Sequence, residues 1–272
     1  MSGDGRGVLY PAATPALYRL PAHGRVSSLV RWFWIPEWDI APGRVSRQEL
    51  LAFPACNLAV EPALVGLAGP TTRRSHRDLT GRGWTVGALL QPAAVPHLTT
   101  DPYALRDRYQ SLDLPELHRT VTAAMTGQEE GDLRRGRAVE AFTDWLVATL
   151  PPPDANGLLA NALAELVDGD PTVLQVQDAA SRLNVSARTL QRLARRHVGL
   201  SPAAMIRRRR LQEAAERLRA NPDADLTTVA AELGYADQAH LSRDFRAVLG
   251  FTPSSYRASC PTLGEGRSSE AG

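Results

Sequence analysis

Two stretches of the chain share one pattern, and they read Val176-Gln-Asp-Ala-Ala-Ser-Arg-Leu-Asn-Val-Ser-Ala-Arg-Thr-Leu-Gln-Arg-Leu193 and Val229-Ala-Ala-Glu-Leu-Gly-Tyr-Ala-Asp-Gln-Ala-His-Leu-Ser-Arg-Asp-Phe245. In each stretch a small residue stands four positions before a turn residue: Ala180 before Asn184, and Ala230 before Gly234. A tight turn between two helices favours a residue that tolerates positive φ, and Gly and Asn do so best. The repeated pattern therefore predicts two helix-turn-helix units.

A second helix is expected after each turn. Ser186 and Asp237 stand where they can act as N-caps. The residues expected to face the core of these helices are Leu190, Leu193 and Ala194 in the first, and Leu241, Phe245 and Val248 in the second. Between the units, the stretch from Ser201 to Leu218 predicts a connecting helix, with Pro202 in its first turn.

Polar side chains share the opposite face of each second helix. In the first unit these are Arg188, Gln191, Arg192 and Arg195, spaced at i, i+3, i+4 and i+7. In the second they are Gln238, Ala239, Ser242 and Arg243, with Arg246 nearby. Arginine can bind guanine and glutamine can bind adenine in the major groove, each pair contributing about 1–3 kcal/mol of discrimination. An ordinary solvated helix face is the alternative for either stripe alone.

Positive charge is concentrated around the repeated pattern. Residues 182–219 hold 11 arginines and two glutamates, while the whole chain has a formal net charge of +2. This asymmetry favours a nucleic-acid surface. Arg195, Arg196, Arg207 and Arg246 are candidates for contacts with the DNA backbone. The run Arg207 to Arg210 would spread around a helix, so one or two of its members are expected to pack or to pair with Glu213.

The bulk composition excludes several classes of protein. With 272 residues and 43% apolar content, the chain can form real cores, and it has no run of 18 apolar residues that would predict a membrane span. The N-terminal residues lack the apolar region of a signal peptide, so a cytoplasmic location is expected. The two cysteines, Cys56 and Cys260, predict no disulfide framework.

The first half of the chain reads differently from the second. Short apolar runs of strand length alternate with Gly and Pro from Val26 to Leu98, which predicts a small β-sandwich or barrel. Two of these expected strands are Glu49–Phe53 and Asn57–Val60. The pattern becomes helical from Asp101. An apolar stripe of Val139, Phe142, Leu146 and Leu150 is either core packing or a dimer seam. Pro151 to Pro153 should stop that helix.

These observations predict an α+β fold, in which a mostly-β regulatory domain with helices precedes an all-α domain of two helix-turn-helix subdomains joined by a helix. The expected boundaries are a flexible segment at 1–24, a sensor domain at 25–150, a linker and helix at 151–167, a DNA-binding domain at 168–258 and a disordered tail at 259–272.

The region from Thr172 to Arg257 resembles the AraC/XylS family of bacterial transcriptional regulators. Its most specific part runs from Ala230 to Arg257, with Gly250 followed by Thr-Pro and Tyr-Arg. The resemblance implies base-reading roles for the following residues: Arg188, Gln191, Arg192, Gln238, Ser242 and Arg243. The chain departs from the family where Ala194 replaces Phe, Met205 replaces Tyr and Asn184 replaces Gly. The segments Phe53–Val60, Ala68–Pro70 and Gly87–Pro92 resemble the sensor region of one AraC-type subgroup.

Other candidate sites in the first half have weaker patterns. His76, His97 and His118 lack metal-ligand spacing. Cys56 reads as a buried inert thiol rather than a redox switch. Trp32 and Trp34 lie on one face of an expected strand, where they form either plain core or an aromatic ligand pocket.

The sequence thus predicts a cytoplasmic, sequence-specific DNA-binding transcription regulator that is not an enzyme and uses no cofactor or metal. The expected partners are double-stranded promoter DNA, RNA polymerase if it activates, a small-molecule effector and a second copy of the chain, with no membrane. Two alternatives remain open: a DNA-modifying or repair enzyme with an N-terminal catalytic domain, and a constitutive DNA-binding protein whose N-terminal domain only dimerises.

Overall fold

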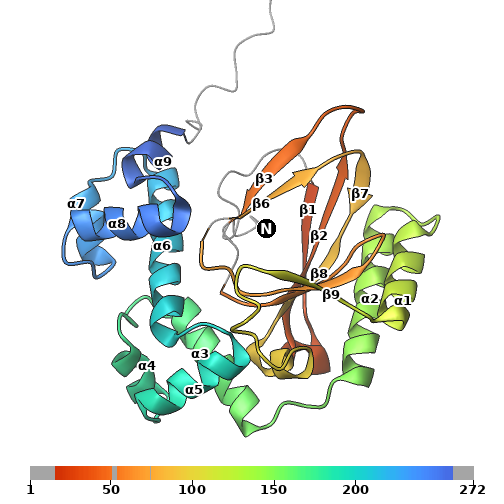
Figure 1. The fold of residues 1–272 in the computed structure, drawn as a ribbon, viewed down its shortest axis with the longest axis horizontal. Helices are drawn as coiled ribbons and strands as arrows, with labels where there is room; N and C mark the ends of the chain where they lie inside the picture. Colours follow the sequence, from red (N-terminus) through yellow and green to blue (C-terminus); the bar gives the residue numbers. More distant parts are fainter. Residues whose placement is uncertain (1–15, 51–53, 74, 260–272) are drawn as a thin grey trace, which may run out of the picture. The chain divides into compact units, whose positions relative to one another are not determined.

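The computed structural model describes residues 16–50, 54–73 and 75–259, and Figure 1 shows their elements in chain order. The chain divides into two compact units between Arg209 and Arg210. A mostly-β N-terminal domain and an all-helical C-terminal part are both present, as the sequence predicted. No helix in the described ranges combines the length and the apolar character needed to cross a membrane.

The first compact unit, which ends at Arg209, contains all of the described strands. They are β1 (Ala16–Pro21), β2 (Val30–Asp39), β3 (Ser46–Leu50), β4 (Asn57–Val60), β5 (Val65–Ala68), β6 (Ser75–Leu79), β7 (Arg82–Trp84), β8 (Val86–Leu90) and β9 (Tyr109–Leu112). A seven-stranded antiparallel sheet has the order β1-β2-β8-β4-β5-β9, with β7 paired to β2. Strands β3 and β6 form a separate two-stranded sheet.

Two strands differ from the sequence-based expectation. Ala16–Pro21, which was expected to lie in a flexible segment, forms β1 and pairs along β2. Tyr109–Leu112, which was expected to be helical, forms β9 and pairs with β5. Both strands leave most of their side chains exposed or half-buried, so neither has a clear alternation of buried and polar residues. Glu49 and Leu50 of the expected strand Glu49–Phe53 lie in β3, and residues 1–15, 51–53 and 260–272, with Cys260, lie outside the described residues.

Two helices, α1 (Pro115–Thr126) and α2 (Gly131–Thr149), cover one face of the large sheet (Figure 1). The rings of Phe33 on β2 and Phe142 on α2 meet with their centres 5.7 Å apart. Leu146 and Leu150 are buried in the same core, and Val139 packs against it. The apolar stripe of α2 therefore forms core, which was one of the two predicted interpretations. Two short 3-10 helices, η1 (Gly24–Ser28) and η2 (Pro92–His97), complete this domain.

The remaining helices form the two helix-turn-helix units. They are α3 (Ala155–Gly169), α4 (Val176–Arg182), α5 (Ala187–His197), α6 (Pro202–Ala220), α7 (Leu226–Glu232), α8 (Gln238–Leu249) and α9 (Pro253–Ser259). In the first helix-turn-helix unit, Leu163 and Val167 of α3 share a core with Leu190 and Ala194 of α5. In the second unit, Phe245 packs against Phe251 and Tyr256, which stack on each other at 5.4 Å.

Two helices of the first helix-turn-helix unit, α3 and α5, are also bonded to the β-rich domain. The Asn161 side chain accepts a hydrogen bond from the Ala93 N–H and donates one to the Ser28 carbonyl, both at 2.8 Å. Asp168 pairs with Arg31 of β2. The Nδ1 atom of His197 lies 3.2 Å from the carbonyl oxygen of Pro92. The first helix-turn-helix unit therefore belongs to the same compact body as the sheet.

Candidate nucleic-acid interface

The turns of the two helix-turn-helix units have the same backbone geometry. Asn184 and Gly234 both have positive φ, at 53° and 73°. The N–H of the next residue reaches back to the small residue before the turn: Val185 to the Ala180 carbonyl at 3.0 Å, and Tyr235 to the Ala230 carbonyl at 2.9 Å. This is the Schellman arrangement that ends helices with a left-handed residue. Asparagine does in the first unit what glycine does in the second.

Both of the predicted N-caps are confirmed. The Ser186 hydroxyl accepts a hydrogen bond from the Thr189 N–H at 3.1 Å, and the Asp237 carboxylate accepts one from the His240 N–H at 2.6 Å. Each cap satisfies a backbone donor that the first helical turn would otherwise leave unpaired. Turn and cap together determine where α5 and α8 begin, and hence which side chains share a face.

On α5 the predicted faces are separated as expected. Leu190, Leu193 and Ala194 are buried in the core. The polar residues are exposed, namely Arg188, Gln191, Arg192, Arg195 and Arg196. The structure thus brings four arginines and one glutamine to the solvent side of a single three-turn helix.

On α8 the separation is similar but the face is less basic. Leu241, Phe245 and Val248 are buried. The residues Gln238, Ala239, Arg243 and Arg246 are exposed, and Ser242 is half-buried. The Nε atom of Arg243 donates to the Ala239 carbonyl at 3.3 Å, so this side chain lies back along its own helix.

The arginine run of α6 is divided between solvent and core. Arg207 is exposed, whereas Arg208 and Arg209 are 4% and 6% exposed. Arg208 donates to the Thr71 hydroxyl and Arg209 to the Val173 carbonyl, both at 3.0 Å. Burial lowers the pKa of Arg208 to about 10, against an opposing effect of Asp107. The packing that was predicted for part of this run is confirmed, and Glu213 pairs with Arg217 further along the helix.

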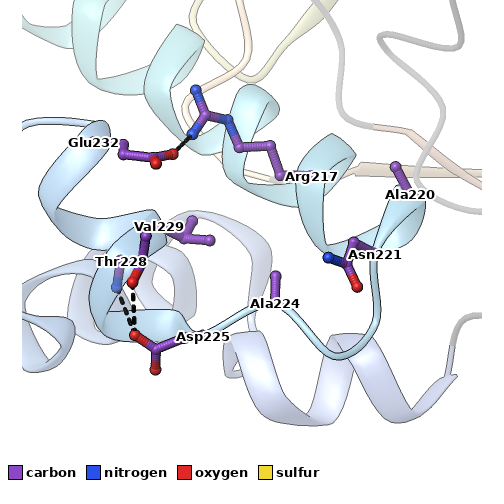
Figure 2. Close-up of a pocket in the computed structure, with 8 residues that line it drawn as sticks. All are labelled: Arg217, Ala220, Asn221, Ala224, Asp225, Thr228, Val229 and Glu232. Atoms are coloured by element: carbon purple, nitrogen blue, oxygen red, sulfur yellow. Dashed lines mark hydrogen bonds and ion pairs between the residues drawn. The ribbon is translucent and has the colours of Figure 1, made fainter.

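The second helix-turn-helix unit has a pocket of about 450 Å³ between the end of α6 and α7, shown in Figure 2. Arg217 crosses its rim to pair with Glu232. On the other side, the Asp225 carboxylate accepts a hydrogen bond from the Thr228 N–H at 2.9 Å and so caps α7. The hydrogen bonds from Thr228 also hold the pKa of Asp225 below its usual value. The Arg217–Glu232 pair therefore joins α7 to α6, while Asp225 determines where α7 begins.

Trp32 and Trp34 are half-buried and alternate along β2 with the core residue Phe33. The Trp32 ring has the guanidinium groups of Arg19 and Arg31 at 5.3 and 5.0 Å from its centre. The Trp34 indole donates to the Asn57 side chain at 3.0 Å and lies where a Cβ on Gly87 would collide with it. The two indoles therefore already have protein partners, and their role as a ligand pocket stays a prediction.

The other candidate sites of the N-terminal domain are the Cys56 thiol and the histidines. Cys56 is fully buried, and burial raises the pKa of its thiol to about 12. Among the described residues, no group of three or more His, Cys, Asp and Glu side chains is placed to hold a metal ion. The sequence did not reveal the links made by Asn161 and His197, because their partners lie 68 and 105 residues away along the chain.

Two family models match the chain. Residues 179–259 match a helix-turn-helix domain, and residues 10–110 match a domain of unknown function, DUF6597. A putative AraC-like transcription regulator from Streptomyces lividans is 29% identical over 61% of the chain, and the transcriptional activator RhaS from Pectobacterium carotovorum is 37% identical over 29% of it. The matched parts span 54% and 28% of those relatives. A crystal structure of apo ToxT from Vibrio cholerae aligns with a TM-score of 0.44 at 11% identity, covering 88% of this chain and 99% of that one.

Proposed function

We propose that this chain, which belongs to the AraC/XylS family of bacterial transcriptional regulators, controls transcription by reading two adjacent major-groove segments of promoter DNA with α5 and α8. One observation carries the proposal: the same turn and cap precede two helices that each bury one side and expose arginine and glutamine on the other. Residues of this kind in this arrangement suit hydrogen bonding to base edges.

In this proposal Arg188, Gln191 and Arg192 read bases from α5, and Gln238, Ser242 and Arg243 read bases from α8. The exposed residues Arg195, Arg196, Arg207 and Arg246 contact phosphates. Two reading helices on one side of the duplex would meet the major groove about one helical turn apart. Promoter DNA is the principal partner, and RNA polymerase is a further partner if the protein activates. A cytoplasmic location belongs to the same proposal.

The N-terminal domain would control binding through a small-molecule effector or through dimerisation. A ligand shifts such an equilibrium only if it favours one arrangement of the domain over another. The bonds that join α3 to η2 and β2, and α5 to η2, support this view, because a rearrangement of these elements would change the position of α5. Trp32 and Trp34 are the candidate effector contacts.

The rival proposal, an N-terminal DNA-modifying or repair enzyme, needs a reactive group. The Cys56 thiol, with its pKa raised to about 12, stays protonated at neutral pH and is a poor nucleophile. The relatives that cover the C-terminal region carry names of transcription regulators. Regulation is therefore favoured over catalysis.

Selection of binding sites from random duplex DNA tests the proposal, using the whole chain and two variants at physiological salt. The unsubstituted chain should enrich two conserved blocks. Arg188→Ala should relax the base preference at a position in one block, and Arg243→Ala at a position in the other, at a cost of about 1–3 kcal/mol for each lost bidentate contact. Unchanged preferences in both variants would show that the reading faces are wrongly assigned.

A further inference from the structure

The N-terminal domain places an aromatic ring beside the end of α5. Tyr103 lies in the segment between η2 and β9, and its side chain is exposed. Two guanidinium groups lie close to this one ring: that of Arg106, 3.4 Å from the ring centre, and that of Arg195, at 4.7 Å. Arg195 belongs to the exposed face of α5, whereas Arg106 belongs to the N-terminal domain.

The backbone around Tyr103 is held in this position by contacts on both sides. The Asp101 carboxylate accepts hydrogen bonds from the N–H groups of Tyr103 and Ala104, at 3.1 and 3.2 Å. On the side of α5, Gly199 has a φ of +80°, and a Cβ there would collide with the Pro102 carbonyl. The loop and the end of α5 therefore approach each other at backbone distance, and Tyr103 stays beside Arg195.

Among the described residues, the two carboxylates nearest to this ring in the sequence, Asp101 and Asp107, are bonded to groups other than the two guanidinium groups. The Asp101 carboxylate is used by backbone N–H groups, and the Asp107 carboxylate accepts hydrogen bonds from Thr72. Within the part of the chain that the structure describes, neither Arg106 nor Arg195 forms an ion pair. Two guanidinium groups gathered on one exposed ring make a local positive potential, and a guanidinium matches the geometry of a phosphate.

We propose that Arg106 and Arg195, both aligned on Tyr103, bind the phosphodiester backbone of the DNA that α5 reads. The N-terminal domain then supplies a DNA contact of its own, outside the helix-turn-helix region. This inference rests on the proposed function, since it requires α5 to lie at DNA. Arg106 is half-buried, and it is the residue that a search for helix-turn-helix patterns would overlook.

The test uses the full chain and two duplexes, one with the selected site and one with a scrambled site. Fluorescence anisotropy titrations between 50 and 200 mM salt give the slope of log affinity against log salt concentration. Removing one phosphate contact flattens that slope by about 0.9. Over this fourfold range of salt, the fold-decrease in the affinity of Arg106→Gln should therefore be about three times smaller than that of the unsubstituted chain. The preference for the selected site over the scrambled site should stay the same.

Three controls separate a local contact from a general change of charge. Arg82→Gln removes an exposed arginine of β7 and should leave the slope unchanged. Tyr103→Phe keeps the ring and should behave as the unsubstituted chain, while Tyr103→Ala should flatten the slope in the same direction as Arg106→Gln. Thermal melts establish that each variant is folded before it is titrated.

The inference is overturned if Arg106→Gln has the same slope as Arg82→Gln, or if Tyr103→Ala binds both duplexes more tightly. The second result would mean that Tyr103 withholds Arg195 from DNA. If the unsubstituted chain shows no preference for the selected duplex, the proposed function fails as well. An intact preference with an unchanged slope in Arg106→Gln contradicts this inference alone.

Discussion

The guanidinium carbon of Arg210 lies 3.8 Å from the centre of the Tyr235 ring. Arg210 belongs to α6, and Tyr235 follows the turn that leads to α8. The Tyr235 ring in turn meets His240 edge-on at 5.1 Å. The Nε and Nη2 atoms of Arg210 are buried without a hydrogen-bond partner among the described residues. The ring is thus a principal partner of this cation, and the contact links the connecting helix to the start of the second reading helix.

A double-mutant cycle measures this link. Replacing Arg210 with Met and Tyr235 with Leu, singly and together, should give a coupling free energy of about 1–2 kcal/mol in urea unfolding, because a desolvated cation–π pair is lost. The same cycle with Arg207→Met, an exposed arginine of α6, should give no coupling. A value for the Arg210 cycle as small as that of the Arg207 cycle would mean that the two side chains are only neighbours.

Two glycines should respond to alanine in opposite directions. Gly199→Ala should destabilise the protein by more than about 1 kcal/mol, because a side chain is strained at φ +80° and its Cβ would meet the Pro102 backbone. Gly136→Ala, inside α2 with open space around it, should stabilise by about 0.5–1 kcal/mol. Urea unfolding of both variants checks this pair. Equal effects would contradict the close approach of α5 and the loop at Pro102.

The Asn161 side chain should contribute much more to the free energy of unfolding than an ordinary surface residue does. Asn161→Ala leaves the Ala93 N–H and the Ser28 carbonyl without their partner, so the free energy of unfolding should fall by about 2–4 kcal/mol. Asn156→Ala, at an exposed position of the same helix, should change it by less than about 0.5 kcal/mol. A small loss in Asn161→Ala would show that α3 is held to η1 and η2 by other contacts.

His197 should make stability depend on pH. Burial of the imidazole lowers its pKa below the usual value of 6.5, although the hydrogen bond to Pro92 opposes this. Arg196 and His97 act with burial, and Asp154 acts against it. Because the unfolded chain then binds more protons than the folded chain, stability should fall as the pH drops below about 6.5.

His197→Gln keeps a donor for the Pro92 carbonyl but does not titrate. Urea unfolding midpoints between pH 5 and 7 should therefore be flatter in this variant than in the unsubstituted chain. Parallel curves for the two proteins would assign the acid sensitivity to other groups and contradict a buried neutral imidazole at this position.

Local features of the fold could be predicted, and long-range ones could not. The turns at Asn184 and Gly234, the caps at Ser186 and Asp237 and the buried face of α8 depend on residues within one or two helical turns, so their spacing is visible in the sequence. By contrast, Arg208 is bonded to Thr71, 137 positions away, which leaves no periodic pattern.

The same distinction applies to the N-terminal domain. The strand Asn57–Val60 was predicted with its observed bounds because it is almost wholly apolar and is bounded by turn residues. Strands β1 and β9 were missed because they pair at the two edges of the sheet and leave most side chains partly in solvent. The exposed face of α5 was predicted, but its neighbour Tyr103 was not, since that contact joins residues that lie far apart in the chain.

The proposed function requires α5 and α8 to read one duplex about one helical turn apart. Its most direct test is the affinity of the full chain for the selected site with about five base pairs inserted between the two blocks, which turns one block to the opposite side of the duplex. If α5 and α8 read the two blocks together, the affinity should fall about tenfold or more, to that for a duplex with one block scrambled. An affinity that the insertion leaves unchanged would contradict joint reading of the two blocks by α5 and α8.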